Sequence, residues 1–561
     1  MEEEKREGRE KTEDNALLKI TSIGGSGMFG MNCMLLESAK SRILVDCGIM
    51  FPADDDWGVD LITPDFSVLE TQPLDGIVLT HAHEDHIGAI AFLLKTMQKR
   101  GFRGKMPIYG TDITLAFVKR RLTEHELLSS VLFNVINTKE EFNLGDCRVE
   151  CIDVCHSIPG SVAYAFYTPA GTIVHSGDWR IDNTPMAGAK TNLARLEALG
   201  DEGVRVLLAD STNVEVDDAM ASELDIYNDL LEVFTKLKGR IFVTLFASNI
   251  GRLQSIFTAA AAANRKIAVC GRSLNSNLGI ARELNYFSMP NDMEIVAEHK
   301  IEEAGENIVV VISGSQGERA SSLYKLSQAK HNNIRLRPSD TLIYSARQIP
   351  GNEKRVGAIV DGFYRQGASL FNPRDAVFHS SGHGGRKELE LLIELLEPEI
   401  FVPIHGDYRR LSMHEALADD MQPSPDRSIT IEEGYTLKLF SDRHELEQSF
   451  IPSRRYVVGK SLDGMDRDCA REKKVLGHNG MLFVGGALNK DEQLRGELRI
   501  EEFGISSDKS FLKDMQDELK RTIISSAKHG DMQEIIRHKA AKIIKQKLGK
   551  FPHVIVHFEF V

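Results

Sequence analysis

The residues best suited to chemistry are concentrated in one short stretch, His81-Ala82-His83-Glu84-Asp85-His86. Neutral imidazole and carboxylate are ligands that zinc and similar divalent ions accept, and this stretch offers more of them than one tetrahedral site requires. The alternative is a polar helix start, with Asp85 as the cap and the histidines in solvent. The density of imidazoles favours metal, so the stretch predicts two neighbouring divalent ions.

The surrounding sequence predicts the elements that position this cluster. The apolar run 76–79 indicates a strand, and the amphipathic segment 87–97 indicates a helix, so the cluster falls on the turn between them. Metal-binding residue types also follow other predicted strands, where a sheet projects side chains from one edge: His156, Asp178, Asp210 and His405. Asp46 ends a further strand and either orients the histidines or caps a turn.

Length and composition indicate a globular protein with two to four domains. The chain has 561 residues, of which 42% are hydrophobic and 27% charged. We find no apolar run of membrane-spanning length and no signal peptide, and the seven cysteines form no Cys-x-x-Cys pair. These features predict a cytoplasmic protein with reduced thiols and no membrane partner. The net charge of −14 argues against nucleic-acid binding by bulk attraction, although bound cations can override it locally.

Changes in sequence texture predict the domain organisation. Residues 1–16 are typical of a disordered tail. The strand-rich stretch 17–224 resumes at 366–445, after an alternating strand–helix unit at 225–365 that is typical of a parallel α/β domain. A polar linker at 446–458 and a small α+β domain at 459–561 complete the prediction. The last strand alternates Val554, Val556, Phe558 and Phe560, an apolar stripe that suggests self-association.

Nine motifs carry a resemblance to a known family. They are H-A-H-E-D-H at 81–86, C-H-S-I-P at 155–159, S-G-D-W at 176–179, D-S-T-N at 210–213, F-A-S-N at 246–249, G-S-Q-G-E at 314–318, I-P-G-N-E at 349–353, S-G-H at 381–383 and P-I-H-G-D at 403–407. Over roughly residues 17–561 the chain resembles the ribonuclease J family, in the β-CASP branch of the metallo-β-lactamase superfamily. The resemblance implies an α/β fold, a metallo-β-lactamase αββα sandwich with an inserted β-CASP α/β domain and a small α+β C-terminal domain.

The resemblance also implies roles for individual residues. It places one divalent ion on His81, His83 and His156 and the other on Asp85, His86 and His405, with Asp178 bridging. Zinc is the first choice for both ions, with manganese as the alternative. It implies that Asp85, His383 and Asp210 are catalytic, with His383 as the acid that protonates the leaving group and Asp210 bonded to it.

Two segments resemble the family's substrate contacts. The first is the loop His379, Ser380, Ser381, Gly382 and His383, which resembles a phosphate-binding loop. The second is Ser248 with Asn249, at a predicted helix N-terminus over 249–263, a position that suits phosphate. An ordinary N-cap role for Ser248 is the alternative.

The implied function is a metal-dependent ribonuclease in RNA decay and maturation. It would degrade single-stranded RNA from the 5′ end, also cut internally, and leave 5′-phosphates. The resemblance further implies a homodimer or homotetramer and an RNA-decay complex. The alternatives are a β-CASP DNA nuclease, a small-molecule metallo-hydrolase of the same fold, and a non-enzymatic RNA-binding subunit. The long insert argues against the second alternative, and the intact ligand set argues against the third.

Four departures from the family pattern leave the predicted metal ligands intact. Met28 replaces a common Glu, and Gly251 replaces a bulkier residue. Ser345-Ala346-Arg347-Gln348 stands where a serine run is usual, and Gly384-Gly385 replaces an Ala-Ser pair. These changes concern the grip on the RNA 5′ end, and therefore the preference for a 5′-monophosphate and the balance of exo- and endonuclease action.

Overall fold

The computed structural model describes residues 16–52, 59–69, 72–290, 293–349, 351–371, 378–460, 467–491, 493–506, 508–526 and 531–561. These residues fall into two compact units. The first runs to Arg454 apart from a short segment ending at Leu61, and the second contains that segment and the chain from Arg455. The predicted tail at 1–16, except its last residue, lies outside the described residues, as does Pro350 of the 349–353 motif.

The first unit contains two sheets that pack face to face. The eight-stranded sheet has the order β24 (His444–Gln448), β23 (Tyr435–Leu439), β1 (Leu18–Gly24), β3 (Cys33–Glu37), β4 (Arg42–Val45), β6 (Gly76–Val78), β7 (Met106–Gly110), β8 (Val131–Val135). The seven-stranded sheet has the order β22 (Arg427–Ser428), β20 (Ile400–Ile404), β13 (Val206–Asp210), β12 (Gly171–His175), β11 (Val162–Thr168), β10 (Cys147–Asp153), β9 (Phe142–Leu144). Buried residues of both sheets, such as Ile20 and Leu208, form one shared core.

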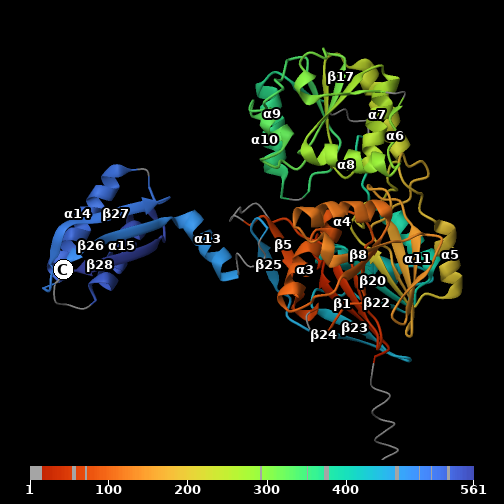
Figure 1. The fold of residues 1–561 in the computed structure, drawn as a ribbon, viewed down its shortest axis with the longest axis horizontal. Coiled ribbons are helices and arrows are strands. Elements are labelled where there is room, and N and C mark those ends of the chain that lie inside the picture. The colour runs from red at the N-terminus through yellow and green to blue at the C-terminus, as the bar shows by residue number, and fades with distance from the viewer. Residues whose placement is uncertain are drawn as a thin grey trace, which may run out of the picture. The chain divides into compact units, whose positions relative to one another are not determined.

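Helices flank this pair of sheets. On the seven-stranded sheet, α5 (Leu193–Glu202), α11 (Arg386–Leu396) and α12 (Tyr408–Asp420) bury a second core against the strands. In the eight-stranded sheet, α3 (Ile90–Lys99) connects β6 to β7, and α4 (Asp112–Glu124) connects β7 to β8 (Figure 1). The amphipathic segment at 87–97 folds as the end of α2 (Glu84–Ile87) and most of α3. The two packed sheets with helices outside them confirm the predicted αββα sandwich.

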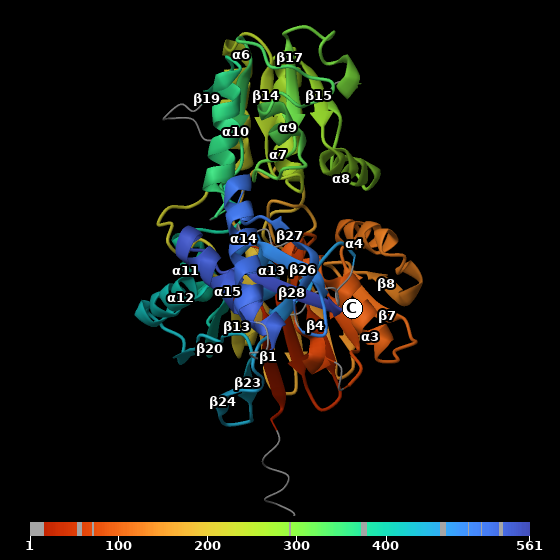
Figure 2. The same ribbon diagram turned by 90° about the vertical axis from the view of Figure 1, so that its left-hand side faces the viewer.

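The inserted domain is a parallel six-stranded sheet. Its order is β16 (Ile295–Val296), β15 (Lys266–Cys270), β17 (Ile308–Ile312), β14 (Ile241–Thr244), β18 (Thr341–Tyr344), β19 (Ser369–Phe371). The helices α6 (Glu223–Lys236), α7 (Ile250–Ala262) and α8 (Arg272–Glu283) contribute to one core, and α9 (Ser322–Ser327) and α10 (Glu353–Arg365) to the core on the other face (Figure 1). Figure 2 shows β14, β15 and β17 side by side. The run Ile-Val-Val-Val-Ile of β17 is typical of a strand buried on both faces.

The insertion makes the sandwich discontinuous in sequence. Strands β13 and β20 are parallel neighbours, with Asp210 opposite Ile404, although the whole inserted domain lies between them in the chain. The sheet that carries several candidate site residues is therefore assembled from segments on both sides of the insert.

The second unit contains the small C-terminal α+β domain. Its central strand β26 (Met481–Leu488) pairs with β27 (Leu494–Phe503) and β28 (His553–Phe560). Together with α14 (Lys509–Ser526) and α15 (Met532–Leu548) the strands form a core that includes Val554, Val556 and Phe558, whereas Phe560 is 62% exposed. Most of the predicted stripe therefore packs inside the domain, because the helices cover the face of β28 that carries it.

The segment predicted as a linker contains regular structure. Residues 446–448 belong to β24, which pairs with β23 at the edge of the eight-stranded sheet, and 454–457 form β25 (Arg454–Val457). The sequence of β24, His-Glu-Leu-Glu-Gln, has a single apolar residue, and the strand is largely exposed. Such an edge strand lacks the alternation that distinguishes a strand from a linker.

Candidate metal centre and substrate site

The candidate site lies at the carboxyl ends of strands from both sheets. Asp178 follows β12, Asp210 ends β13 and His405 follows β20, and these three strands are parallel neighbours. Their carboxyl ends meet at one edge of the sheet, where α/β proteins commonly bind ligands. The cluster at 81–86 approaches from β6 of the other sheet and enters α2.

Three imidazoles and one carboxylate form the first set of possible metal ligands. The Nδ1 atom of His83 lies 3.0 Å from Nε2 of His81 and 3.1 Å from Nε2 of His156. Oδ2 of Asp178 lies 3.5 Å from the same nitrogen of His81. Burial lowers the pKa of His83 to about 4 and the pKa values of His81 and His156 well below their usual range. Three neutral rings thus direct nitrogen atoms at one point, which fits a cation better than a chain of hydrogen bonds.

A second set shares a carboxylate with the first. Oδ2 of Asp85 lies 3.3 Å from Nε2 of His405 and 3.7 Å from Nε2 of His86. Oδ2 of Asp178 lies 3.3 Å from the same nitrogen of His86 and 3.6 Å from that of His405. Burial lowers the pKa of His405, but Asp178 and Asp85 outweigh it and raise this pKa to about 9. The two overlapping sets bring together all seven residues predicted as ligands and fit two divalent ions.

Nε2 of His83 lies 3.4 Å from Oγ of Ser157, and the second ring nitrogen of each of the other four histidines also has a partner on the protein. The pairs are His81 Nδ1 with Thr80 Oγ1 at 3.0 Å, His86 Nδ1 with Asp46 Oδ2 at 2.7 Å, His156 Nδ1 with the Gly382 carbonyl at 2.6 Å, and His405 Nδ1 with Thr212 Oγ1 at 2.7 Å. Such contacts fix the tautomer and the orientation of a ligating ring. Asp46 therefore orients a histidine and does not merely cap a turn. Sequence reasoning missed the other partners, and for Gly382 no signal exists because the contact uses the backbone.

His383 lies beside the two ligand sets. Its Nδ1 is 2.7 Å from Oδ2 of Asp210, and its Nε2 is 3.9 Å from Oδ2 of Asp178. Burial lowers the pKa of His383, but the carboxylates of Asp210 and Asp178 outweigh this effect and raise it overall. The predicted contact between His383 and Asp210 is present.

The candidate phosphate loop is held by contacts within the protein. The hydroxyl of Ser380 accepts a hydrogen bond from Arg180 at 2.8 Å, and that of Ser381 accepts one from the His383 backbone N–H at 3.2 Å. The carbonyl of Gly382 is bonded to His156. Among the described residues, Nδ1 of His379 is buried without a partner, and burial lowers the pKa of this ring to about 3. His379 is therefore neutral, with one nitrogen left for another group.

The second candidate substrate contact differs from the prediction in one respect. The N-cap of α7 is Asn249, whose Oδ1 accepts a hydrogen bond from the Arg252 N–H at 2.9 Å, and not Ser248. Asparagine is as good a cap as serine, so composition could not decide between the two neighbours. At the start of α7 the backbone N–H groups of Asn249, Ile250 and Arg252 already donate within the protein, and Oδ1 of Asn249 is used as well.

Comparison with known proteins decides the family. Three family models match: "Beta-lactamase superfamily domain" over 41–244, "Ribonuclease J, beta-CASP domain" over 238–363 and "Zn-dependent metallo-hydrolase RNA specificity domain" over 375–424. The chain is 33% identical to ribonuclease J of Helicobacter pylori, over 97% of this chain and 79% of that protein. It is 34% identical to ribonuclease J 1 of Streptococcus pyogenes, over 85% of this chain and 84% of that protein. The chain belongs to the ribonuclease J family.

This membership confirms the resemblance seen in the motifs. As a member of the ribonuclease J family, the protein is a metal-dependent ribonuclease that binds RNA and divalent metal ions. A crystal structure of a protein of unknown function from Enterococcus faecalis shares the fold, with a TM-score of 0.53 and 15% identity over 75% of this chain and 100% of that one. Within the described ranges, no helix combines the length and apolar character needed to cross a membrane.

The structure gives physical consequences for two departures from the ribonuclease J pattern. A Cβ atom at Gly385 would lie 2.2 Å from the Asp218 carbonyl oxygen, so this backbone approach requires glycine. A Cβ atom at Gly251 would meet nothing closer than 3.8 Å, from Oδ1 of Asn249, so the smaller residue leaves space beside the start of α7. Both changes lie next to segments predicted to contact substrate.

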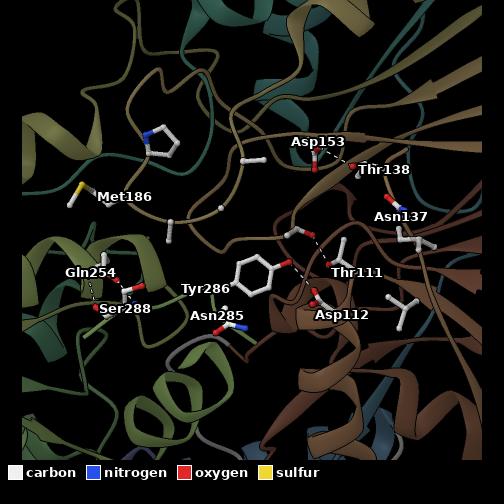
Figure 3. A pocket seen from close by; sticks show the side chains of 17 residues that line it. Thr111, Asp112, Asn137, Thr138, Asp153, Met186, Gln254, Asn285, Tyr286 and Ser288 are labelled. Carbon is white, nitrogen blue, oxygen red and sulfur yellow. Dashed lines mark hydrogen bonds between the residues drawn. The ribbon is translucent and has the colours of Figure 1, made fainter. Parts of the chain in front are cut away.

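A separate pocket of about 820 Å³ lies between the sandwich and the inserted domain (Figure 3). The hydroxyl of Tyr286 donates to Oδ1 of Asp112 at 2.8 Å across it, and Thr138 donates to Asp153 at 2.9 Å. Its lining contains two carboxylates and no lysine or arginine. The negative charge of these two carboxylates is unfavourable for the phosphates of RNA.

Proposed function

We propose that this ribonuclease hydrolyses single-stranded RNA with two metal ions, degrades it from the 5′ end, also cuts internally, and leaves 5′-phosphates. The observation that carries the proposal is the position of Asp178. Its Oδ2 lies 3.3–3.9 Å from a ring nitrogen of each of five histidines, so one carboxylate oxygen belongs to both ligand sets and also faces the candidate acid.

The proposed ligand assignment follows the two sets. His81, His83 and His156 would hold one ion, Asp85, His86 and His405 the other, and Asp178 both. Zinc suits this histidine-rich set, with manganese as the alternative. Paired divalent ions in such a site would neutralise charge at the phosphoryl group and lower the pKa of the attacking water.

The chain's own residues would complete the reaction. Cleavage that leaves a 5′-phosphate expels a ribose 3′-oxygen, which is a poor leaving group unless it is protonated. His383, held at Nδ1 by Asp210, presents Nε2 toward Asp178 and is placed to donate that proton. A positioned acid of this kind contributes ~10²–10⁴-fold to the rate.

The loop from His379 to Gly382 and the start of α7 would bind the RNA backbone. Ser380 and Ser381 accept hydrogen bonds within the protein, and each hydroxyl retains a proton to donate to a phosphate oxygen. The Asn249 side chain can donate from Nδ2, while the Ser248 hydroxyl is the second candidate there. A site placed between two domains favours one threaded strand over a duplex.

We place this activity in RNA decay and maturation in the cytoplasm. The protein would act as a homodimer or homotetramer, and an RNA-decay complex is the expected wider partner. Relatives named ribonuclease J support the ribonuclease activity on which this proposal rests.

One experiment separates this proposal from its alternatives. Purified protein is incubated with 5′-monophosphorylated RNA, with DNA and with a thioester, each with and without a chelator. We expect cleavage of RNA alone and its loss on chelation. Cleavage of DNA would favour a β-CASP DNA nuclease, turnover of the thioester a small-molecule hydrolase, and binding of RNA without turnover a non-catalytic subunit.

A further inference from the structure

The arginines nearest the candidate phosphate loop differ in how their charges are neutralised. Arg180, 2% exposed, pairs with Asp182 at 2.5 Å and lies 3.6 Å from Glu223. Arg252, fully buried, pairs with Glu223 through Nη2 at 2.9 Å and Nε at 3.0 Å. These two guanidinium groups are committed to buried ion pairs and hold the loop in place. Arg347 is exposed, and among the described residues it makes no ion pair.

The backbone that carries Arg347 is fixed on both sides. Two residues earlier, the Ser345 hydroxyl bonds both the Arg252 guanidinium and the Phe378 carbonyl at the start of the loop. The carbonyl of Arg347 itself accepts a hydrogen bond from the buried Gln316 amide at 3.0 Å. The chain thus places an exposed positive charge on a well-supported backbone beside the loop.

One hydrogen bond ties the Arg347 side chain to the candidate site. Its Nη1 donates to Oδ1 of Asn213 at 2.9 Å, and Nδ2 of Asn213 donates to the His383 carbonyl at 2.8 Å. Asn213 thus links the Arg347 guanidinium to the backbone of His383, the candidate acid. Its remaining N–H groups form no hydrogen bond within the described part of the chain, and their planar fork matches two oxygens of a phosphate.

We propose that Arg347 binds a phosphate group of the RNA next to the reacting phosphodiester. The proposal rests on the ribonuclease function proposed above. The phosphate has two possible sources, a terminal 5′-monophosphate or an internal phosphodiester of the strand. A guanidinium can bind either phosphate. Only binding of the terminal phosphate makes the effect of Arg347 depend on the group at the RNA 5′ end.

The test compares Arg347→Gln and Arg347→Lys with the unaltered protein on one single-stranded RNA prepared with a 5′-phosphate and with a 5′-hydroxyl. For Arg347→Gln we expect KM to rise about tenfold, which corresponds to about 1.4 kcal/mol of lost binding, with little change in kcat. The slope of log affinity against log salt should fall by about 0.7, the value for one phosphate contact on a single strand. Arg347→Lys should keep the slope and recover part of the affinity.

The two substrates identify the source of the phosphate. A KM effect confined to 5′-phosphorylated RNA assigns the terminal group, and an equal effect on both assigns an internal phosphate. The control is Arg365→Gln, a 76% exposed arginine of the same domain at the end of α10, which should change neither KM nor the salt slope.

A different pattern would overturn the inference. If Arg347→Gln lowers kcat and leaves KM and the salt slope unchanged, the residue only positions His383 through Asn213. Unchanged kinetics in every respect would also refute a phosphate contact. If the unaltered protein cleaves neither RNA while remaining folded and metal-loaded, the proposed function itself fails.

Discussion

Nδ1 of His383 lies 2.7 Å from Oδ2 of Asp210, and the opposite nitrogen of the same ring faces Asp178. A histidine bonded in this way to a carboxylate keeps one nitrogen oriented toward the reacting group. We therefore expect His383→Ala to retain its metal ions and to lose ~10²–10⁴-fold in single-turnover cleavage of RNA.

The leaving group distinguishes an acid from a binding residue. RNA with a 3′-bridging sulfur expels a thiolate, which leaves without protonation, so His383→Ala should recover much of its activity on that substrate. An equal loss on the oxygen and sulfur substrates would leave His383 as a phosphate contact and the acid unassigned.

Removal of a proposed metal ligand should abolish cleavage. His83→Ala removes the nitrogen at the centre of the first set, and Asp178→Ala removes the oxygen common to both. Metal content measured by mass spectrometry should fall with activity while the fold persists. His299→Ala, at an exposed histidine of the inserted domain, should keep both. Full activity and full metal content in His83→Ala would refute the two-metal assignment.

Asp46 offers a test of ligand orientation without removal of a ligand. Its carboxylate holds Nδ1 of His86 and also accepts from the N–H of Thr80 at 2.8 Å. Asp46→Asn keeps the size and removes the charge, so metal affinity should fall ~10–100-fold. Titration against a chelating indicator measures this change. An affinity equal to that of the unaltered protein would show that His86 needs no carboxylate to orient it.

The buried pair of Glu223 and Arg252 should stabilise the protein and make it sensitive to acid. Burial raises the pKa of Glu223, but Arg252 outweighs this effect and lowers it overall. The stabilisation is therefore complete above the unfolded pKa of about 4.3 and is lost as the pH falls through the lower folded value. Glu223→Gln should cost ~3–5 kcal/mol at neutral pH, with the difference shrinking in acid.

A matched control exists on the same helix. Glu232 is 61% exposed and pairs with Lys236, and Glu232→Gln should change the free energy of unfolding by less than ~1 kcal/mol. Urea denaturation at several pH values measures both variants. Equal effects of the two substitutions would mean that burial does not increase the contribution of the Glu223–Arg252 pair to the free energy of unfolding.

The C-terminal domain is expected to mediate self-association, although by residues other than most of the predicted stripe. Val554, Val556 and Phe558 lie in the domain's own core, whereas Phe503 and Phe560 are 59% and 62% exposed. Deletion of residues 459–561 should lower the mass measured by light scattering and weaken activity. A truncated chain with the oligomeric state of the parent would contradict this expectation.

The sequence predicted which side chains come together at the candidate metal centre, because these side chains are of distinctive type and follow strand ends. His156, Asp178 and His405 each follow a strand of one sheet, and the sheet brings them together. The groups that orient these donors could not be predicted in the same way. Thr80 is a common residue type, and the Gly382 contact is a backbone carbonyl, so neither has a pattern of its own.

The same reasoning explains where the fold departed from expectation. The exposed edge strand β24 has no apolar face, so its sequence is typical of a linker. The stripe on β28 was correctly read as one apolar face of a strand, but periodicity does not reveal what covers that face. Which surface is free depends on packing against α14 and α15, and packing is a property of the whole domain.

The neighbouring position of β13 and β20 has a consequence for synthesis on the ribosome. The edge of β13 that will pair with β20 has no partner until the chain has been translated past the entire inserted domain. At ~5–20 residues per second, the residues between them take roughly ten to forty seconds to emerge. Throughout that interval the nascent chain lacks His405, so the second ligand set and the sheet are completed by the same late segment. A chain released before that segment would have an unpaired strand edge, which promotes aggregation, and an incomplete candidate site.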